Sequence, residues 1–419
     1  MQTSIATRAT ATATDEEARA ILRRCVHCGF CNATCPTYQV LGDERDSPRG
    51  RIYLIKQMLE GGAASHATQT HLDRCLTCRN CETSCPSGVQ FGQLLDIGRE
   101  VAEATVQRPL KQRLQRAALR HGINSALFAP AVRLAQALRV LLPAAWRASL
   151  RPRHGGRPLP HYATHARQVL LLAGCVQTVT MPAIDAATVR VLDSLGIGAR
   201  MARGSGCCGA VNFHLGGQAA ARRQMRANID AWWPLLESGA VESIVVNASG
   251  CGATLKEYPH HLRGEPDYFA RAEAIAARVC DVAEIVAPHA HTLRPRLGAS
   301  VRAAFHPPCT LQHWQSLRPL TENMLQALGF DLLPFAEQHL CCGSAGAYAL
   351  LQGEIARTLR DRKLAAVAAA APDLVLSSNA GCIGHLQHGT RLPVRHWIEA
   401  LDDRMVVAAS TPPGGAGHG

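Results

Sequence analysis

Short apolar runs alternate with amphipathic stretches along the second half of the chain and predict an α/β fold there. Continuous runs of leucine and β-branched residues are typical of strands buried in a parallel sheet. The runs are QVLLLAGC, ESIVVNASGC, VRAAFHPPC and DLVLSSNAGC, at 168–175, 242–251, 301–309 and 373–382. Stretches between them, such as 184–195 and 321–330, are expected to be helices that cover the sheet. Each run ends at a cysteine.

The first hundred residues show helical periodicity instead. Residues 48–62 carry one apolar face and end in glycines, which predicts a helix. The apolar residues of that face are Ile52, Ile55, Met58 and Leu59. Residues 15–24 and 91–106 are predicted helices too, and Thr14 with Glu17 fits a capping box at the start of the first.

Changes in this pattern divide the chain into segments. We expect a disordered tail (1–14), a cysteine-rich helical domain (15–105), a helical connector (106–160), two α/β halves (161–295 and 296–405) and a second disordered tail (406–419). The apolar and basic residues of 134–160 are compatible with a membrane surface, although a helix packed on the next domain explains them as well. The Arg, Gly and Pro residues at 151–160 predict a linker.

Composition and charge narrow the class of protein. The chain has 419 residues, 47% of them apolar, which suffices for two or three packed domains. The net charge of +12 is spread along the chain, so we expect no nucleic-acid partner. Signal-peptide and membrane-spanning patterns are not found. We therefore expect a cytoplasmic protein, at most peripheral on the inner membrane, whose 17 cysteines are reduced and available to metal.

Two segments carry the same four cysteines followed by proline. CVHCGFCNATCP spans 25–36 and CLTCRNCETSCP spans 75–86. This is the bacterial ferredoxin pattern, in which three thiolates bind one [4Fe-4S] cluster and the fourth binds the other. We assign cluster 1 to Cys25, Cys28, Cys31 and Cys85. We assign cluster 2 to Cys75, Cys78, Cys81 and Cys35.

Zinc is the alternative for these cysteines, because zinc also binds all-thiolate sites built from C-x2-C pairs. The third thiolate and the fourth before proline, both present twice, favour iron-sulfur clusters. His27 lies inside the first motif and is expected to face solvent or to tune the polarity near the cluster. Since every ligand is internal, we expect the clusters to carry single electrons rather than to bind substrate.

The C-terminal part contains an internal duplication. Its first half carries Cys175, Cys207, Cys208 and Cys251, and its second half carries Cys309, Cys341, Cys342 and Cys382. In each half two adjacent cysteines precede a glycine, here called the CCG motif. Adjacent cysteines cannot easily form a relaxed disulfide, so metal or redox chemistry is favoured. Open α/β sheets place such sites at the carboxyl ends of their strands.

The expected fold class is therefore a multidomain α+β and α/β protein, in which a helical two-[4Fe-4S] ferredoxin-like domain precedes two duplicated α/β CCG halves.

Gly204, Gly206 and Gly209 match the dinucleotide pattern G-x-G-x-x-G. The preceding IGARMAR is a poor match to a buried strand, and the cysteine pair explains the glycines better, so no nucleotide is expected there.

Both ferredoxin motifs, the segment GDERDSPRGRIYLIK and both CCG halves together resemble the iron-sulfur subunits of bacterial glycolate oxidase, over residues 15 to 405. The wider family includes iron-sulfur subunits of anaerobic glycerol-3-phosphate dehydrogenase, lactate-utilisation proteins and heterodisulfide reductases. The resemblance implies two flavoprotein partners that bind FAD and oxidise glycolate to glyoxylate. This chain would have no catalytic residue and would pass electrons to a quinone or another respiratory acceptor.

The chain departs from the fuller family pattern, in which each CCG half ends in C-x-x-C and five cysteines can hold a non-cubane cluster. Ala248 and Asn379 replace the first cysteine of that pair. The eight remaining CCG cysteines are compatible with a third metal site, a relic scaffold, a docking surface or a quinone pocket. Nearby histidines that could bind metal or relay protons are His214, His306, His339 and His385. Cys280 is expected to be a small core residue.

Other functions fit parts of the pattern. A self-sufficient reductase would need the ligands that Ala248 and Asn379 replace. A zinc-stabilised nucleic-acid-binding protein would need a concentrated basic patch. Related lactate or glycerol-3-phosphate dehydrogenases are alternatives within the family, because the substrate pocket would lie on another polypeptide.

Overall fold

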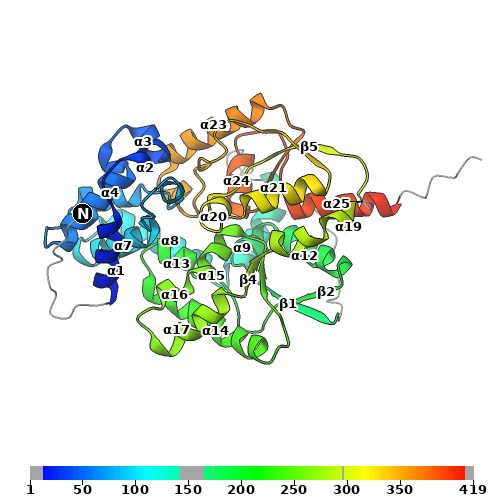
Figure 1. Cartoon of the computed structure of the whole chain (residues 1–419), viewed down its shortest axis with the longest axis horizontal. Helices are drawn as coiled ribbons and strands as arrows, with labels where there is room; N and C mark the ends of the chain where they lie inside the picture. Colours follow the sequence, from blue (N-terminus) through cyan, green and yellow to red (C-terminus); the bar gives the residue numbers. More distant parts are fainter. Residues whose placement is uncertain (1–12, 142–164, 173, 295–296, 411–419) are drawn as a thin grey trace, which may run out of the picture.

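The computed structural model describes residues 13–141, 165–172, 174–294 and 297–410. A helical N-terminal domain lies beside two α/β halves that pack on each other (Figure 1). The expected tail before residue 13, the linker at 151–160, most of the segment 134–160 and the end of the chain after residue 410 lie outside the described residues.

Helices build the N-terminal domain. They are α1 (Ala13–Arg24), α2 (Phe30–Ala33), α3 (Pro36–Leu41), η1 (Glu44–Asp46), α4 (Pro48–Leu59), α5 (His66–Asp73), α6 (Asn80–Thr83) and α7 (Phe91–Thr105). The side chain of Ser47 caps α4 by accepting a hydrogen bond from the Gly50 N–H at 3.0 Å, and Pro48 occupies the first turn. The predicted apolar face of α4 is buried, and the helix packs on α7.

The predicted capping box at the start of α1 is wrong. The helix begins at Ala13, so Thr14 lies within the first turn and not at the cap. The Thr14 hydroxyl instead accepts a hydrogen bond from Arg263 at 3.3 Å, and Glu17 forms an ion pair with the same arginine at 3.0 Å. These contacts tie α1 to the first α/β half.

Each α/β half contains one sheet of four parallel strands, and both sheets have the same strand order. The first has the order β2-β1-β3-β4, with β1 (Arg167–Leu171), β2 (Ile197–Arg200), β3 (Ile244–Val246) and β4 (Val279–Asp281). The second has the order β6-β5-β7-β8, with β5 (Val301–Phe305), β6 (Phe330–Leu332), β7 (Leu374–Ser377) and β8 (Val394–His396). The internal duplication is confirmed.

The registers of the two sheets also correspond. Leu170 lies beside Ile244 in the first sheet, and Ala304 lies beside Val375 at the equivalent place in the second. The four predicted runs contain β1, β3, β5 and β7, which are the central strands. Central parallel strands are covered on both faces, which explains why they appear in the sequence as continuous apolar runs.

The segment IGARMAR needs a correction, because its residues Ile197–Arg200 form the edge strand β2. Ile197 and Ala199 are buried in the core, so a glycine and an arginine do not prevent pairing at a sheet edge. The glycine pattern after β2 leads at Gly209 into α13 (Ala210–His214), a helix of five residues. A dinucleotide site normally has a longer helix at that point.

Helices cover both sheets. In the first half they are α11 (Gln177–Thr180), α12 (Pro182–Ser194), α13, α14 (Gln218–Glu237), α15 (Ser249–Lys256), α16 (Tyr258–His261), α17 (Pro266–Ala276), α18 (Val282–Val286), η3 (Ala287–His289) and α19 (Ala290–Leu293). In the second half they are α20 (Cys309–Gln312), α21 (Arg318–Ala327), α22 (Tyr348–Leu351), α23 (Gly353–Ala369), α24 (Ala380–Gln387) and α25 (Trp397–Ser410). The predicted covering helices correspond to α12 and α21.

The two halves share one hydrophobic core. Ile184 and Val189 of α12 belong to the same buried cluster as Trp397 of α25. At the edge of this contact the Arg190 guanidinium donates hydrogen bonds to both carboxylate oxygens of Asp402, at 3.0 and 2.6 Å. The two halves therefore form one packed unit. The last helix, α25, extends five residues past the expected end of the second half at residue 405.

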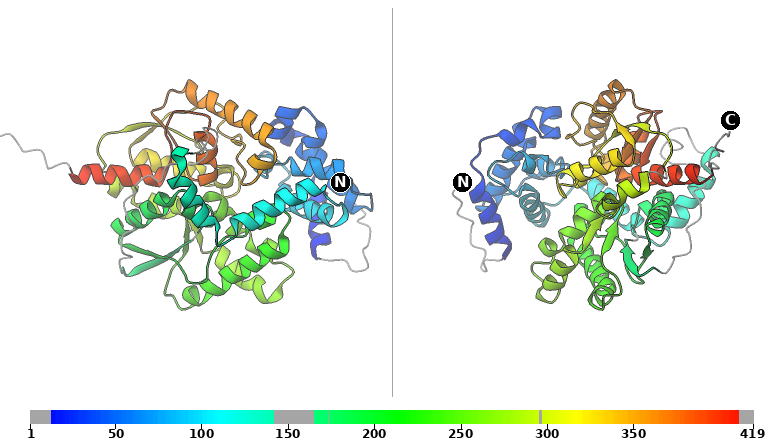
Figure 2. Two further views of the ribbon diagram at one scale, coloured as in Figure 1. Left: turned by 180° about the vertical axis from the view of Figure 1, so that it is seen from behind. Right: turned by 45° about the vertical axis from the view of Figure 1, so that its right-hand side comes forward.

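The described part of the connector, up to residue 141, is helical as expected, with α8 (Leu110–Ile123), α9 (Phe128–Ala137) and η2 (Arg139–Leu141). It runs from the N-terminal domain along the first half (cyan in the left view of Figure 2). Asn124, between the two helices, exchanges side-chain hydrogen bonds with Asn212 at 3.3 Å and with Gln224 at 2.8 Å. Within the described ranges, no helix has the length and apolar character needed to cross a membrane.

The glycine of each CCG motif lets a helix approach closely. Gly343 has a φ of +89°, and a Cβ there would lie 2.5 Å from the carbonyl oxygen of Ala356. The equivalent Gly209 has a φ of +94°, and its Cβ would lie 3.2 Å from the carbonyl oxygen of Ala221. Both positions therefore need glycine, and a Cβ would have less space at Gly343 than at Gly209.

We predict that Gly343→Ala lowers the thermal unfolding temperature by several degrees. The left-handed φ alone costs about 1–2 kcal/mol for an alanine, and the contact with Ala356 adds to this cost. Gly346→Ala is the matched control, because Gly346 has a φ of +61° and a Cβ added there would meet no atom within 4 Å. Calorimetry under exclusion of oxygen measures both variants. Equal decreases would contradict the packing argument.

Candidate iron-sulfur sites and cysteine pairs

Left-handed backbone turns shape both ferredoxin motifs in the same way. His27 and Gly29 have φ of +58° and +86°, and Thr77 and Arg79, 50 positions later, have φ of +53° and +59°. Left-handed conformations are costly for residues other than glycine and are concentrated at functional sites. These turns curl the chain so that successive cysteines face one side. The Thr77 N–H also points at the Cys75 Sγ, at 3.4 Å.

The first cavity collects the four cysteines predicted for cluster 1. Cys25, Cys28, Cys31 and Cys85 line a space of about 440 Å³ near the surface, and His27 and Cys81 line it too. Burial, followed by the charges of Cys25, Cys85 and Cys28, raises the pKa of Cys31 to about 11. Thiolates packed this closely need a cation to compensate their charge. Cys28 is exposed, so this site opens toward solvent.

The second cavity collects the four cysteines predicted for cluster 2. Cys35, Cys75, Cys78 and Cys81 line a space of about 300 Å³, and all four are buried. Burial, and after it the charges of Cys78, Cys75 and Cys35, raise the pKa of Cys81 well above its ordinary value. Each of the two donor sets consists of four soft sulfur atoms without a carboxylate, and such a set fits an iron-sulfur cluster or zinc.

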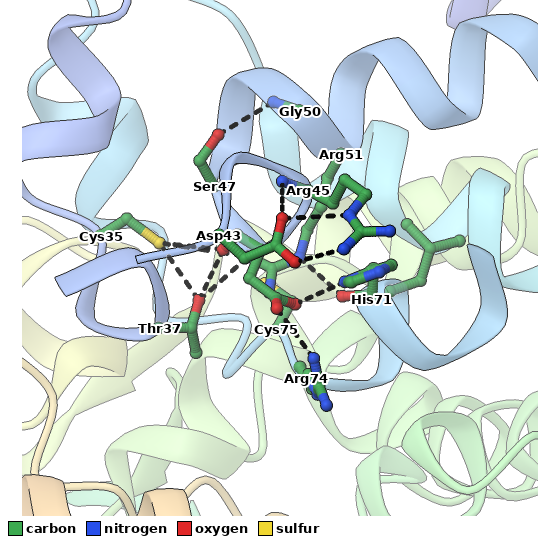
Figure 3. Close-up of polar contacts among 12 residues, drawn as sticks. Cys35, Thr37, Asp43, Arg45, Ser47, Gly50, Arg51, His71, Arg74 and Cys75 are labelled. Carbon is green, nitrogen blue, oxygen red and sulfur yellow. Dashed lines mark hydrogen bonds and ion pairs between the residues drawn. The ribbon is translucent and has the colours of Figure 1, made fainter. Parts of the chain in front are cut away.

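A buried ion-pair network lies behind the second cavity. Asp46 is fully buried, and its carboxylate accepts hydrogen bonds from Arg51 at 3.3 Å, from Arg74 at 2.9 Å and from the His71 Nδ1 at 3.0 Å. Figure 3 shows Arg51, His71 and Arg74 of this network close to one another. Arg51 is also fully buried. Because Arg74 directly precedes Cys75, the network connects the segment after the first motif to the start of the second.

The network reaches the sulfur of Cys35. The Arg51 Nη1 donates to the Thr37 hydroxyl at 3.1 Å and lies 4.0 Å from the Cys35 Sγ, while the Thr37 hydroxyl lies 3.3 Å from the same sulfur. A cation and a hydroxyl beside a ligand sulfur stabilise negative charge there and tune the potential of a bound cluster. Nothing in the spacing of the sequence identified these residues, because an aspartate, a threonine and an arginine near a cysteine motif are common.

The cysteines of the first CCG half contact one another in a chain. Cys175 follows β1, Cys207 and Cys208 precede α13, and Cys251 lies in α15. Hydrogen bonds from Cys175 and then Cys208 lower the pKa of Cys207 to about 3. Hydrogen bonds with Cys207 and Cys251 raise the pKa of Cys208 well above its ordinary value.

The second CCG half repeats this chain and extends it to the ferredoxin motif. Cys309 lies within hydrogen-bonding reach of both Cys341 and Cys78, and these contacts together with burial raise its pKa well above the ordinary value. The hydrogen bond with Cys341 lowers the pKa of Cys342, but the hydrogen bond with Cys382 and burial outweigh it and raise this pKa above its ordinary value. The sulfur of Cys78 in the second cavity is thus linked to the cysteines of the second half. The sequence could not reveal this contact, because it joins positions 231 residues apart.

Arg79 joins the N-terminal domain to both halves. Its guanidinium forms an ion pair with Glu257 of the first half and stacks on Trp314 of the second, 3.5 Å from the ring centroid. The Trp314 Nε1–H donates to the Thr77 carbonyl at 3.1 Å. The Tyr348 hydroxyl donates to the Arg74 carbonyl at 3.0 Å. The cysteine motifs are therefore held against the CCG halves by several directed contacts.

The histidines expected near the CCG cysteines lie in different environments. His214 is exposed at the end of α13. His339 is exposed. The His385 ring is bonded through its Nε2 to the Ala356 carbonyl at 3.1 Å. His306 is fully buried and lies against Cys342 and Cys382.

Cys280 is only half-buried in the edge strand β4, so the expectation of a core residue is wrong for this position. The residues of β4 alternate between buried and partly exposed, and Cys280 falls on the open face.

These features define a class of protein: two all-cysteine sites of ferredoxin type joined to a duplicated cysteine-rich α/β unit. Residues 21–89 match the 4Fe-4S dicluster domain, and residues 169–256 and 303–387 match the cysteine-rich domain.

Comparison with whole proteins identifies the family. The chain is 47% identical over 407 residues to the glycolate oxidase iron-sulfur subunit of Escherichia coli (strain K12), covering 97% of this chain and 99% of the relative. It is 29% identical over 399 residues to the probable glycolate oxidase iron-sulfur subunit of Bacillus subtilis (strain 168), covering 88% and 89%. Lactate utilization protein A of Geobacillus kaustophilus is 26% identical over 250 residues, covering 57% and 99%. The chain therefore belongs to the family of glycolate oxidase iron-sulfur subunits.

We predict that Asp46→Asn destabilises the chain by about 3–5 kcal/mol, because it leaves the buried Arg51 guanidinium without its counter-ion. The second cavity depends on this network, so about half of the iron should be lost. Asp43→Asn is the matched control, since Asp43 forms an exposed pair with Arg45 at 2.7 Å and should leave stability and iron content nearly unchanged. Thermal unfolding and iron analysis measure both. Full iron content in Asp46→Asn would contradict the role of the network.

Proposed function

We propose that this chain is the iron-sulfur subunit of a flavin-dependent glycolate oxidase, also called glycolate dehydrogenase. Two partner subunits that bind FAD would oxidise glycolate to glyoxylate, and this chain would carry the electrons to a quinone or another respiratory acceptor. The observation that carries the proposal is the pair of cavities that bring together the four cysteines of each predicted set. One cavity opens to the surface, and the other is linked through Cys78 to the second CCG half. The similarity to the glycolate oxidase subunits supports the choice of substrate.

The ligand sets follow from the two cavities. Cys25, Cys28, Cys31 and Cys85 would hold cluster 1. Cys75, Cys78, Cys81 and Cys35 would hold cluster 2. A [4Fe-4S] cluster accepts and donates one electron at a time, and the protein supplies the sulfur ligands, the burial and the nearby charges that set its potential. No residue of this chain is proposed to touch the substrate.

Electrons would enter beside cluster 1. Cys28 is exposed there, and the neighbouring apolar side chains of Val26 and Phe30 are 67% and 65% exposed. Exposed aromatic and aliphatic side chains around a redox site are suited to docking a partner protein. We therefore place the flavoprotein partners at this surface.

Electrons would leave cluster 2 toward the CCG halves. Cys78 contacts Cys309, and the cysteines of the second half continue from there. Cys35, on the other side of the cavity, is the ligand that Arg51 approaches. The positive charge of Arg51 would favour the reduced state of cluster 2, so that electrons move inward from cluster 1.

We propose a cytoplasmic location with peripheral contact to an anionic membrane. Residues 110–141 contain six Lys or Arg and no Asp or Glu. Leu134 of α9 and the residues at its two ends, Leu127 and Leu138, are 61%, 73% and 45% exposed. Exposed leucines beside basic residues are suited to the headgroup region of anionic lipids. This connector surface would bring the complex near a membrane-bound quinone.

We predict that Cys78→Ser abolishes most glycolate-dependent dye reduction by the assembled complex, because it removes a cluster ligand and the contact to Cys309. The wild-type chain should contain about eight irons in two clusters, and the variant about half of them. Cys280→Ser is the control, since Cys280 lies outside both cavities. Activity of the isolated chain, or full activity of Cys78→Ser, would count against the proposal. A screen of glycolate, lactate and glycerol 3-phosphate tests the substrate.

We predict that the full-length chain sediments with vesicles of anionic lipid at low salt and not with neutral vesicles. The double variant Leu127→Glu and Leu134→Glu should lose this binding, because it places negative charge on the connector surface. Leu350→Glu is the control, since Leu350 is 70% exposed on the second half. Binding that the double variant retains, or absence of binding by the wild type, would refute the membrane contact.

A further inference from the structure

The second CCG half contains a buried histidine without a hydrogen-bond partner. His306 is 1% exposed, and within the described residues neither its Nδ1 nor its Nε2 has a partner. Buried polar groups are almost always hydrogen-bonded, and each exception calls for an explanation such as a missing ion. One atom of the His306 ring and the Sγ atoms of Cys342 and Cys382 lie within 4.8 Å of one another.

The two halves differ at this place although their folds match. His306 directly follows β5, and the residue that directly follows β1, 134 positions earlier, is Leu172. The first half therefore has the same four cysteines and an aliphatic side chain where the second half has an imidazole. Leu172 is buried in the hydrophobic core of the first half. A purely structural role at this position would favour an apolar residue in both halves.

The chemical state of His306 suits a ligand. Burial, and after it the charges of Lys363 and His385, lower the pKa of His306 well below its ordinary value. An imidazole in its neutral form offers a lone pair to a metal ion. Lys363 is also buried and donates to the Glu337 carbonyl.

We propose that His306, Cys342 and Cys382 bind a single thiophilic divalent cation, either Zn²⁺ or Fe²⁺. Ligand atoms on one tetrahedral ion lie about 3.5–3.8 Å apart, given bonds of about 2.3 Å to sulfur and 2.0 Å to nitrogen. The observed grouping within 4.8 Å fits one ion, whereas a cubane distributes its ligands over several irons. Mixed sulfur and nitrogen donors are typical of zinc and iron.

The position of this site gives it a role in the protein. Cys341 contacts Cys309, and Cys309 contacts Cys78 of the second cavity. An iron there would extend the electron path into the second half, and a zinc would fix the cysteines that pack on cluster 2. The inference concerns metal content alone, and it does not depend on which substrate the complex oxidises.

Metal and acid-labile sulfide analysis of the full-length chain, purified without oxygen, tests the proposal. Cubane clusters contain iron and sulfide in about equal amounts, so a single ion appears as about one metal in excess of sulfide. Elemental analysis then tells whether that metal is zinc or iron. Failure of the two-cluster assignment would appear separately, as missing sulfide.

We predict that His306→Leu, which copies the first half, loses the excess metal and keeps the sulfide, and that Cys382→Ser does the same. Cys251→Ser is the matched control, because Cys251 is the counterpart of Cys382 in the first half, and it should keep the excess. His306→Cys, which supplies a thiolate in place of the imidazole, should retain it as well.

Three results would overturn the proposal. The first is a wild-type chain whose metal equals its sulfide, a measurement that needs no variant. The second is an unchanged excess in His306→Leu. The third is a joint loss of iron and sulfide in His306→Leu while the cubane absorption persists, because that result indicates a further cluster in place of a single ion.

Discussion

The arrangement of the N-terminal domain depends on the buried carboxylate of Asp46. It receives hydrogen bonds from Arg51 in α4, from His71 in α5 and from Arg74 at the end of α5. A buried charge is strongly unfavourable unless it is paired and hydrogen-bonded. The buried carboxylate and its donors therefore need one another as partners. That arrangement fixes where Cys75 begins the second motif and places a guanidinium beside Cys35. The geometry of the second cavity follows from it.

A second set of contacts decides how this domain meets the CCG halves. Arg79 adopts a left-handed backbone inside the second motif, and its side chain lies between Glu257 and Trp314. The same residue therefore shapes the cysteine loop and connects it to both halves. Together with the Trp314 hydrogen bond to Thr77, this contact holds Cys78 against Cys309. Electron transfer between the two parts of the chain would need such a fixed approach.

The duplicated halves share one fold but differ in the residues at the carboxyl ends of their central strands. Strand order, register and the cysteine positions correspond, because both halves bury the same central strands. They differ at the carboxyl ends of these strands, where Leu172 of the first half corresponds to His306 of the second. The second half also brings a CCG cysteine, Cys309, against Cys78 of the ferredoxin motif. Divergence of the two halves is therefore concentrated where ligands bind in open α/β sheets.

The sequence by itself determined the elements and the cysteine sets. Spacing within each motif is a local property, so the four-cysteine pattern predicted both groups, and continuous apolar runs predicted the central strands β1, β3, β5 and β7. The sequence pattern was less informative at sheet edges and helix ends. The edge strand β2 pairs on one side only and has no continuous apolar run, and α1 begins before Thr14, the predicted cap. Only the tertiary structure decided that Asp46 faces inward while Asp43 stays at the surface, that Arg79 stacks on Trp314, and that His306 lies against Cys342 and Cys382. Each of these contacts joins residues whose relation depends on how whole elements pack, and no spacing along the chain encodes it.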